Sequence, residues 1–399
     1  MAIYLLATLD TKGQEAELIR QRLVDLDHDV TVVDVGAIGE PRIQADVSRQ
    51  EVFRAAGVSL ESIQEAGDRG AAITAAANGA AVIVEQAFES GQLDGVVALG
   101  GSAGTTIGST AMRSLPIGLP KVMLSTLASG QVRPYVADKD ITMMNSVVDL
   151  AGINRICRQV LLAAAHAVAG MVAHRQVITT DDRPIVAATM FGVTTPCVQH
   201  ARQILEDNGY EVLVFHATGN GGQAMESLIR EGLIAGVLDI TTTELADELV
   251  GGILSAGTER LTAAAESAIP QVVSVGATDM VNFGPPESIP ASFNGRLFYR
   301  HNPTVTLMRT TAAECQELGQ QIARKVAASK GPAAILLPLD GVSAIDKNDQ
   351  PFDDPAARHA LFDGIRNNQS HLQLIEMDCH INDERFAEAA AHRLLEMMR

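Results

Sequence analysis

The 399-residue sequence lacks tryptophan, and its aromatic content is only 4%. Proteins that stack single-stranded bases need aromatic side chains, which this composition supplies sparsely. Positive charge is scarce as well, since 30 Lys and Arg face 48 Asp and Glu for a net charge of −18. A nucleic-acid backbone requires clustered cations. We therefore expect no nucleic-acid partner, and any anionic ligand must be held by local groups against the overall field.

Cysteines and long apolar runs are few. Cys157, Cys197, Cys315 and Cys379 are widely separated and form no C-x-x-C pair. This pattern predicts neither a disulfide framework nor a structural zinc site and is typical of a reduced cytoplasm. No apolar run approaches the roughly 20 residues of a membrane span. The first residues lead into strand and helix signals rather than a signal peptide. The sequence thus predicts a cytoplasmic protein without membrane spans.

The composition and the order of apolar segments indicate an α/β protein. The chain is 47% hydrophobic and 20% charged, which is a globular composition, and its length suffices for two domains. Apolar segments at 3–9, 29–37, 94–101 and 121–126 alternate with segments of helical spacing. This alternation predicts βαβ units in a parallel sheet. The polar segment 39–68 interrupts the rhythm and is interpreted as either a lid over the crevice of the first domain or an arm that grips a partner subunit.

The pattern then repeats. Residues 184–219 align with 3–37, residues 228–244 with 87–106, and residues 270–284 with 120–130, in the same order. Three blocks recurring in order are stronger evidence than any one segment. We predict two related doubly wound, Rossmann/flavodoxin-like parallel-sheet domains, 1–178 and 179–399, of which the second is larger.

The stretch DGVVALGGSAGTT (94–106) carries the first candidate site. It lacks the lysine and the spacing of a P-loop, and no G-x-G-x-x-G follows the first strand. Unpaired N–H groups where the next helix begins, together with the helix dipole, can nevertheless bind an anion. The phosphate-binding candidates are Gly100, Gly101, Ser102, Gly104 and Thr105. The alternative is that the glycines only turn the chain and Thr105 only caps the helix.

Topology adds a second loop to this site. In a sheet of order 2-1-3-4, the crevice lies between strands one and three at their carboxyl ends, so the loop from Thr8 to Gly13 lies beside the glycines. The candidates for a nucleotide site there are Thr8, Asp10, Thr11, Lys12 and Asp34. Lys12 would supply a cation, Asp10 would bind Mg²⁺ through water, and Asp34 would contact the ribose. Helix capping for Asp10 and Thr11, and a solvated strand end for Asp34, are the simpler alternatives.

The second domain offers candidate acid–base residues at its strand ends. Such groups, meeting above one sheet, are how α/β enzymes assemble catalytic sites. The catalytic candidates are His216, Asp239, Glu244 and His301, with a glycine-rich run after His216 that could hold an anion. The alternative is that strand ends in any acidic α/β protein carry several such residues.

Several longer stretches resemble one family. LATLDTKGQE, ADVSRQEVFRAAG, ALGGSAGTT, MNSVVDLAGIN, HATGNGGQAME, DITTTELADELVGG and HNPTVTLMRTT occur in the order found in that family. It comprises the N-terminal inhibitory region of the tomato protein that confers resistance to tomato mosaic virus, together with uncharacterised bacterial relatives. The resemblance covers nearly the whole chain. It implies a two-domain α/β protein that binds ATP with Mg²⁺ and forms homodimers, with the loops at 8–13 and 100–106 facing the nucleotide.

Two main functions follow as hypotheses. The first is an ATP-dependent enzyme that acts on a small carboxylated or phosphorylated metabolite in a cleft between the domains. The second is a nucleotide-gated binding module or dimer without turnover. An enzyme should bring the acid–base candidates of the second domain within hydrogen-bond reach of one another, whereas a module should leave them dispersed. A weaker third hypothesis is an ATP-independent lyase or hydrolase in the second domain alone.

Overall fold

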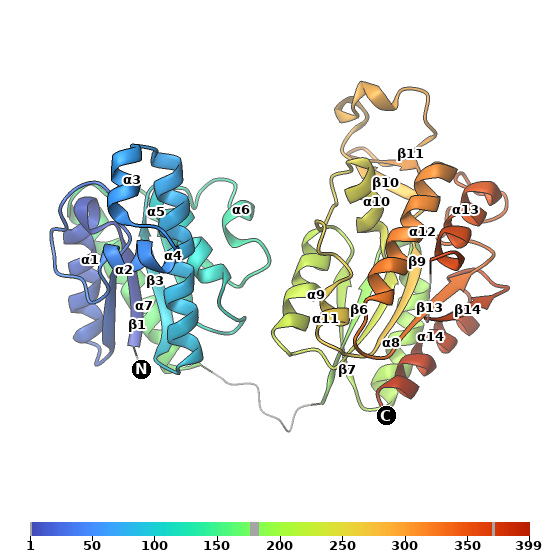
Figure 1. Ribbon diagram of the computed structural model, residues 1–399, viewed down its shortest axis with the longest axis horizontal. Helices are drawn as coiled ribbons and strands as arrows, with labels where there is room; N and C mark the ends of the chain where they lie inside the picture. Colours follow the sequence, from blue (N-terminus) through green and yellow to red (C-terminus); the bar gives the residue numbers. More distant parts are fainter. Residues whose placement is uncertain (1, 176–182, 369–371) are drawn as a thin grey trace. The chain divides into compact units, whose positions relative to one another are not determined.

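The computed structural model describes residues 2–175, 183–368 and 372–399. The chain divides into two compact units, Met1–Thr179 and Thr180–Arg399 (Figure 1). We call them unit 1 and unit 2 and describe each by itself. The boundary predicted from the sequence, between 178 and 179, falls in a segment outside the described residues.

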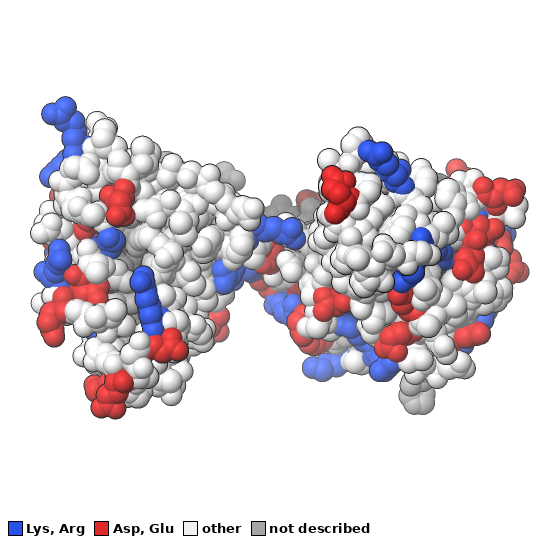
Figure 2. Space-filling view, turned by 90° about the horizontal axis from the view of Figure 1, so that it is seen from above, with Lys and Arg blue, Asp and Glu red and all other residues white. Residues whose placement is uncertain are grey.

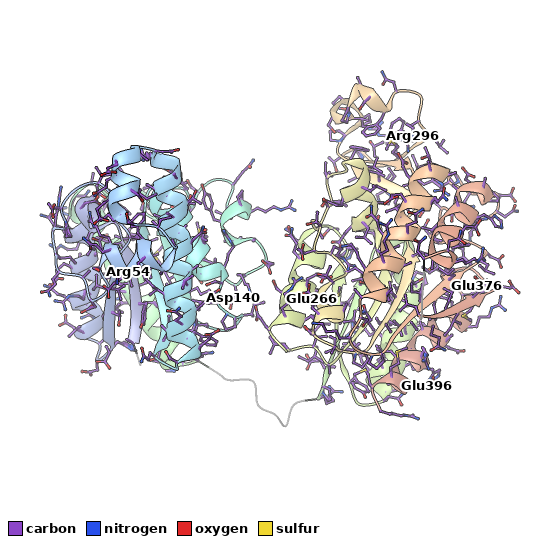
Figure 3. All side chains as sticks on the ribbon, viewed as in Figure 1. Arg54, Asp140, Glu266, Arg296, Glu376 and Glu396 are labelled. Carbon is purple, nitrogen blue, oxygen red and sulfur yellow. The ribbon has the colours of Figure 1, made fainter. Side chains whose placement is uncertain are left out.

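Unit 1 is a five-stranded parallel sheet of order β2-β1-β3-β4-β5. Its strands are β1 (Ala2–Ala7), β2 (Asp29–Asp34), β3 (Leu93–Gly100), β4 (Lys121–Ser125) and β5 (Thr142–Asn145). The predicted order 2-1-3-4 is confirmed, while the short edge strand β5 was not predicted. At the start of β4, the buried Lys121 ammonium donates to the Asp140 carboxylate at 2.6 Å, which ties the segment before β5 to the sheet (Asp140 is labelled in Figure 3).

The strands are apolar on both faces because helices cover both. Along β1, Ile3 and Leu5 pack with α1 (Leu9–Val24) and α7 (Arg155–Ala173). Tyr4 and Leu6 face the other way, toward α4 (Arg69–Glu89) and α5 (Ser102–Arg113). This period of two places successive side chains on opposite faces, as expected for a strand of a doubly wound sheet.

Two helices of unit 1 correct the expectation about apolar runs. By length and hydropathy, α4 and α7 are each long and apolar enough to cross a membrane. Both bury one side in unit 1, however: Ala76, Ala80 and Val84 of α4 and Leu161 and Val168 of α7 lie in its core. Core helices of an α/β unit meet the same criteria of length and composition, so these helices carry no membrane assignment.

The segment 39–68 is an insertion between β2 and α4. It contains α2 (Arg49–Ala55), which begins at a capping box on Ser48, and α3 (Leu60–Ala66). Phe53 of α2 is fully buried in the core. Gly79 of α4 permits the close approach, since a Cβ there would lie 1.9 Å from the carbonyl oxygen of Val52. The insertion therefore packs closely on α4 through α2.

Unit 2 repeats this plan with a six-stranded parallel sheet of order β14-β13-β9-β8-β6-β7. Its strands are β6 (Ile185–Met190), β7 (Glu211–His216), β8 (Gly236–Thr241), β9 (Gln271–Gly276), β13 (Ala333–Pro338) and β14 (Gln373–Met377). The order β7-β6-β8-β9 matches β2-β1-β3-β4 of unit 1. Two parallel-sheet units of the predicted doubly wound class are thus confirmed.

Helices also cover both faces of the second sheet. One face carries α8 (Thr195–Asp207) and α14 (Glu384–Met397). The other carries α9 (Asn220–Arg230), α10 (Thr243–Val250), α11 (Ala263–Glu266), α12 (Ala312–Ala327) and α13 (Pro355–Arg366). Unit 2 also contains an antiparallel sheet of order β10-β12-β11, from β10 (Met280–Phe283), β11 (Phe298–Asn302) and β12 (Val305–Arg309), which the sequence analysis did not predict.

Candidate functional site

Unit 1 contains a cavity of about 910 Å³ at the carboxyl edge of its sheet. It is lined by Thr8 and the start of α1, the turn after β2, the insertion 39–68, α4 and the start of α5. This is the crevice at the topological switch point, where the chain leaves β1 and β3 on opposite sides. Of the residues predicted for a nucleotide site, the cavity is lined by Thr8, Asp10, Thr11, Lys12, Gly101, Ser102 and Gly104. The insertion forms a wall of the cavity, which favours the lid interpretation.

The N-terminus of α5 presents free backbone donors to this cavity. Gly101 is the N-cap residue and offers no side-chain cap. The N–H groups of Ser102, Ala103 and Gly104 belong to the first helical turn, which has no acceptor within the helix. They carry the positive end of the helix dipole. The arrangement is suited to a phosphate or carboxylate group.

Packing explains two glycines of this loop but not the third. A Cβ on Gly100 would lie 2.8 Å from the Cα of Gly104, and one on Gly104 would lie 2.9 Å from the Leu99 carbonyl oxygen. Both glycines therefore allow the helix to approach the strand. A Cβ on Gly101 would meet only Thr126 Oγ1, at 3.8 Å, and its φ of −81° suits any residue. Close approach of a ligand gives a reason for glycine at 101.

Thr105 does not reach the cavity, which corrects its assignment. The side chain is fully buried, and its hydroxyl contacts the Gly101 carbonyl oxygen at 2.8 Å and Ser125 Oγ at 2.6 Å. It therefore fastens the first turn of α5 to the end of β4. Gly100, likewise buried, does not line the cavity.

Lys12 lines the cavity, but its ammonium is engaged elsewhere. It donates to the carbonyl oxygen of Leu150, in the turn after β5. Glu15 of the same helix accepts from the N–H of Gly152 at 2.7 Å. These two contacts hold the segment 146–152 against the start of α1. Lys12 thus positions this turn, and only its remaining N–H groups are available to an anion.

Asp34 has a structural role, which corrects its predicted contact with ribose. It is 1% exposed and does not line the cavity. Oδ1 accepts from the N–H groups of Leu9 and Gly36, at 3.1 and 2.9 Å. Oδ2 accepts from Arg49 Nε at 2.7 Å in a buried ion pair. Asp34 therefore fixes the ends of β1 and β2 and holds Arg49, a residue that the sequence analysis missed.

Two of the carboxylates that line the cavity, Asp10 and Asp149, have different surroundings. Asp10 Oδ2 accepts from the Ile38 and Gly39 N–H groups, at 3.4 and 3.1 Å, while Oδ1 is buried and has no hydrogen-bond partner among the described residues. That free oxygen lies near the Arg49 guanidinium, because both flank Gly36, and a Mg²⁺ ion there would face a cation. Asp149 is exposed and has no hydrogen bond or ion pair among the described contacts. Asp149 thus fits Mg²⁺ better than the predicted Asp10.

The turn that carries Asp149 contains a strained residue. Val147 has φ of +65° and is 69% exposed. A β-branched side chain disfavours this left-handed conformation, and such strain concentrates at functional sites. Because Lys12 and Glu15 also hold this turn, its shape is fixed by the residues that surround the cavity.

We expect Val147→Gly to raise the free energy of unfolding by about 1 kcal/mol, since glycine relieves the strain but gains entropy in the unfolded chain. Urea denaturation followed by circular dichroism measures this change. Val58→Gly is the matched control, because Val58 is exposed and does not have a positive φ. That control should lose stability. A loss of equal size in both variants would show that the backbone at Val147 is not strained.

In unit 2, the predicted acids Asp239 and Glu244 are structural, which corrects their catalytic assignment. Both are fully buried against Arg260, whose guanidinium contacts Asp239 at 2.6 and 2.7 Å and Glu244 at 2.7 Å. Glu226 is a third buried partner, at 3.3 Å. Burial raises the pKa of Glu244, and Arg260 opposes this shift. None of these carboxylates faces open space.

The glycine-rich run after His216 already holds an anion, namely the protein's own carboxylate. Glu244 Oε1 accepts from the N–H groups of Gly219 and Gly222, at 2.6 and 3.1 Å. His216 and His301 lie on the separate strands β7 and β11 with exposed side chains, and within the described parts neither imidazole has a hydrogen bond or ion pair. The four catalytic candidates therefore do not form one site.

Unit 2 also buries a group of titratable residues around Asp279. Its Oδ2 accepts from Ser343 Oγ at 2.8 Å, and Oδ1 has no hydrogen-bond partner in the part of the chain that the structure describes. Burial, and then the charge of Asp346, raise the pKa of Asp279 to about 7. The folded state thus disfavours ionisation of this carboxyl. Its contribution to stability is complete below the unfolded pKa of about 4 and is lost as the pH rises toward 7.

Asp279→Asn should therefore flatten the pH dependence of stability, because the amide resembles the protonated acid. We expect the variant to be more stable than wild type at pH 8, by on the order of 3 kcal/mol, and about equal near pH 4.5. Urea denaturation at the two pH values measures this difference. A variant that is less stable by the same amount at both values would contradict the assigned pKa.

The fold and the cavity define the class of this protein. It is a two-domain α/β protein with a candidate anion-binding site in unit 1, where a cavity at the switch point faces the free N–H donors of a helix N-terminus. Residues 1–177 match the model of "Uncharacterised protein family (UPF0261) N-terminal domain", and residues 183–398 match that of the C-terminal domain. The chain belongs to this family.

Relatives in bacteria and in tomato match nearly the whole chain. The UPF0261 protein of Clostridium tetani is 49% identical over 99% of this chain and 98% of its own length. The ToMV resistance protein Tm-1(GCR237) of Solanum lycopersicum is 41% identical over 99% of this chain, which covers 55% of that protein. The resemblance found in the sequence is thus confirmed. Among solved structures, the glycosyltransferase SnogD of Streptomyces nogalater aligns with 100% of this chain and 99% of its own at 13% identity, with a TM-score of 0.19 that carries no argument.

Proposed function

We propose that unit 1 binds a nucleotide, ATP by the family resemblance, with its phosphates at the N-terminus of α5. Two features of one cavity wall carry the proposal. The first turn of α5 has free N–H donors there, and packing gives no reason for the glycine at 101. A volume of about 910 Å³ suits a small-molecule ligand. Charges of both signs are interspersed on the face shown in Figure 2, so local donors must hold the phosphates.

The rest of the cavity suits a nucleobase. Ile63 of α3, Ile73 and Ala76 of α4 and Ile107 of α5 line it with aliphatic surface. Ile38, at the end of the turn after β2, also lines it and is 83% exposed. Covering such surface with a flat, weakly polar ring is favourable at about 25 cal/mol per Å² of apolar area. The base would therefore lie between the insertion and α4.

Mg²⁺ would accompany the phosphates and neutralise part of their charge. The cavity is lined by four carboxylates, Asp10, Glu40, Asp68 and Asp149, against Lys12 and Arg69. This excess of negative charge makes a divalent cation the natural companion of a polyphosphate. Asp149, which has no competing partner in the described chain, is the residue that would contact it.

Between enzyme and binding module, the geometry of unit 2 favours the module. An enzyme should bring the predicted acid–base residues together, but Asp239 and Glu244 are neutralised by Arg260, and His216 and His301 lie apart and exposed. The proposal is therefore a nucleotide-gated protein in the cytoplasm, whose nucleotide controls a homodimer or a partner complex.

Titration calorimetry of the full chain with ATP, with and without Mg²⁺, tests this proposal. We expect binding that is tighter with Mg²⁺ and a single site per chain. Heat that is unchanged by Mg²⁺, or the absence of binding in both conditions, would contradict it. Measuring phosphate release in the same samples separates the module, which leaves ATP intact, from an ATPase.

A further inference from the structure

Two buried polar atoms beside Gly36, at the wall of the cavity, lie near each other without partners in the described chain. Asp10 Oδ1 and Arg49 Nη2 are each 3.0 Å from the position that a Cβ would take on Gly36, so at most twice that distance separates them. Neither has a hydrogen bond within the described residues. The Arg49 side chain is only 7% exposed. An unpaired buried polar atom costs about 1–3 kcal/mol, so this arrangement calls for a ligand group.

The identities of the two atoms restrict that group. A phosphate oxygen would satisfy the Arg49 donor but would be repelled by the Asp10 carboxylate. A metal ion would satisfy Asp10 but would be repelled by the guanidinium. A hydroxyl group satisfies both, because it donates one hydrogen bond and accepts another. Both bonds would involve a charged partner and are therefore strong.

The rest of Arg49 is held so that only Nη2 is free. Nε donates to Asp34 Oδ2 at 2.7 Å, and Nη1 donates to the Gly39 carbonyl oxygen. Asp34 is thus a positioning residue for this guanidinium. Gly36 and Asp10 line the cavity, and Arg49 Nη2 lies beside Gly36, so the pair is at the cavity wall. A side chain on Gly36 would fill the space between the two atoms.

We propose that this cradle, made of Gly36, Asp10 and Arg49, binds one of the two ribose hydroxyls of the nucleotide, so that the site distinguishes ATP from the analogue that lacks this hydroxyl. The inference rests on the proposed function. Sheet order supports it, since the cradle lies at the end of β2 and the phosphate donors at the end of β3. Two strand spacings, about 10 Å, separate these ends. A nucleotide laid across β1 would place its sugar at one and its phosphates at the other.

The test compares ATP with 2′-deoxy-ATP and 3′-deoxy-ATP by calorimetry on the full-length wild type. We expect one of the two analogues to bind at least tenfold more weakly than ATP. A loss of this size is typical of losing hydrogen bonds to charged groups. Gly36→Ala should bind ATP as weakly as wild type binds that analogue. The variant and wild type should bind the analogue itself with equal affinity. Gly130→Ala, on an exposed turn outside the cavity, is the matched control and should bind all three ligands as wild type does.

Equal binding of ATP and both analogues by wild type would overturn the cradle while leaving the proposed function intact. Weaker binding of an analogue that persists unchanged in Gly36→Ala would also overturn it, because the hydroxyl would then be read elsewhere. Absence of ATP binding by wild type would overturn the proposed function and this inference with it. The comparison on wild type does not depend on how well the variant folds.

Discussion

Gly101→Asp should weaken ATP binding at least 100-fold while leaving the protein as stable as wild type or more so. An added Cβ meets no atom closer than 3.8 Å, so the backbone at this position has room for a side chain to begin. Asp is a favoured N-cap residue, and its carboxylate would accept from the N–H groups that otherwise face the ligand. The new negative charge would also repel the phosphates. The cap and the helix dipole should together raise the free energy of unfolding by about 1 kcal/mol, while the site loses its affinity for the nucleotide.

The opposite signs of the two effects make this variant informative. Calorimetry with Mg²⁺ and ATP measures affinity, and thermal denaturation without ligand measures stability. Gly130→Asp makes the same chemical change on an exposed residue of unit 1 that does not line the cavity, and it should bind ATP normally. Normal ATP affinity in Gly101→Asp would place the phosphates elsewhere.

Arg260→Met should strongly destabilise unit 2 without affecting ATP binding by unit 1. The substitution leaves three buried carboxylates, Asp239, Glu244 and Glu226, without the cation that neutralises them. Breaking a buried ion pair by removing one partner costs about 3–5 kcal/mol. Because three partners are stranded here, we expect a loss at the upper end of that range in the free energy of unfolding of unit 2.

Arg324→Met on the exposed face of α12 is the matched control, because its contact with Glu317 spans 3.5 Å at the surface. That change should alter stability by less than about 1 kcal/mol. Urea denaturation measures both variants, and calorimetry below the unfolding transition measures ATP affinity. If Arg260→Met bound ATP much more weakly while remaining folded, the buried cluster would belong to the nucleotide site.

The two parallel sheets were predicted well from the sequence because the strands and helices that form them follow local patterns. Apolar runs separated by helical segments mark βαβ units, and the internal repeat identified their recurrence. The antiparallel sheet was missed because His301 was placed at the end of a strand of the parallel sheet, although Val305–Arg309 follows Phe298–Asn302 after only two residues, as in a hairpin. The edge strand β5 spans only four residues, too few for a clear period.

The candidate site was predicted in position but not in detail. The order of strands was enough to bring Thr8–Lys12 beside Gly101 and Ser102. Partners distant in sequence decided the rest: Arg49 engages Asp34, Leu150 engages Lys12, and Ser125 engages Thr105. No local pattern reveals such pairs. The same holds in unit 2, where Glu244 fills the glycine-rich run from 22 residues away.

The central claim is that the nucleotide binds at the switch point of unit 1, and hydrogen exchange detected by mass spectrometry with and without Mg²⁺ and ATP tests it most directly. The account predicts slower exchange in peptides covering residues 8–13, 36–40, 60–76 and 100–107. Peptides covering 216–222 and 239–247, whose donors are already engaged by the protein itself, should exchange unchanged. Protection confined to those peptides of unit 2, with none around Gly101, would contradict the account.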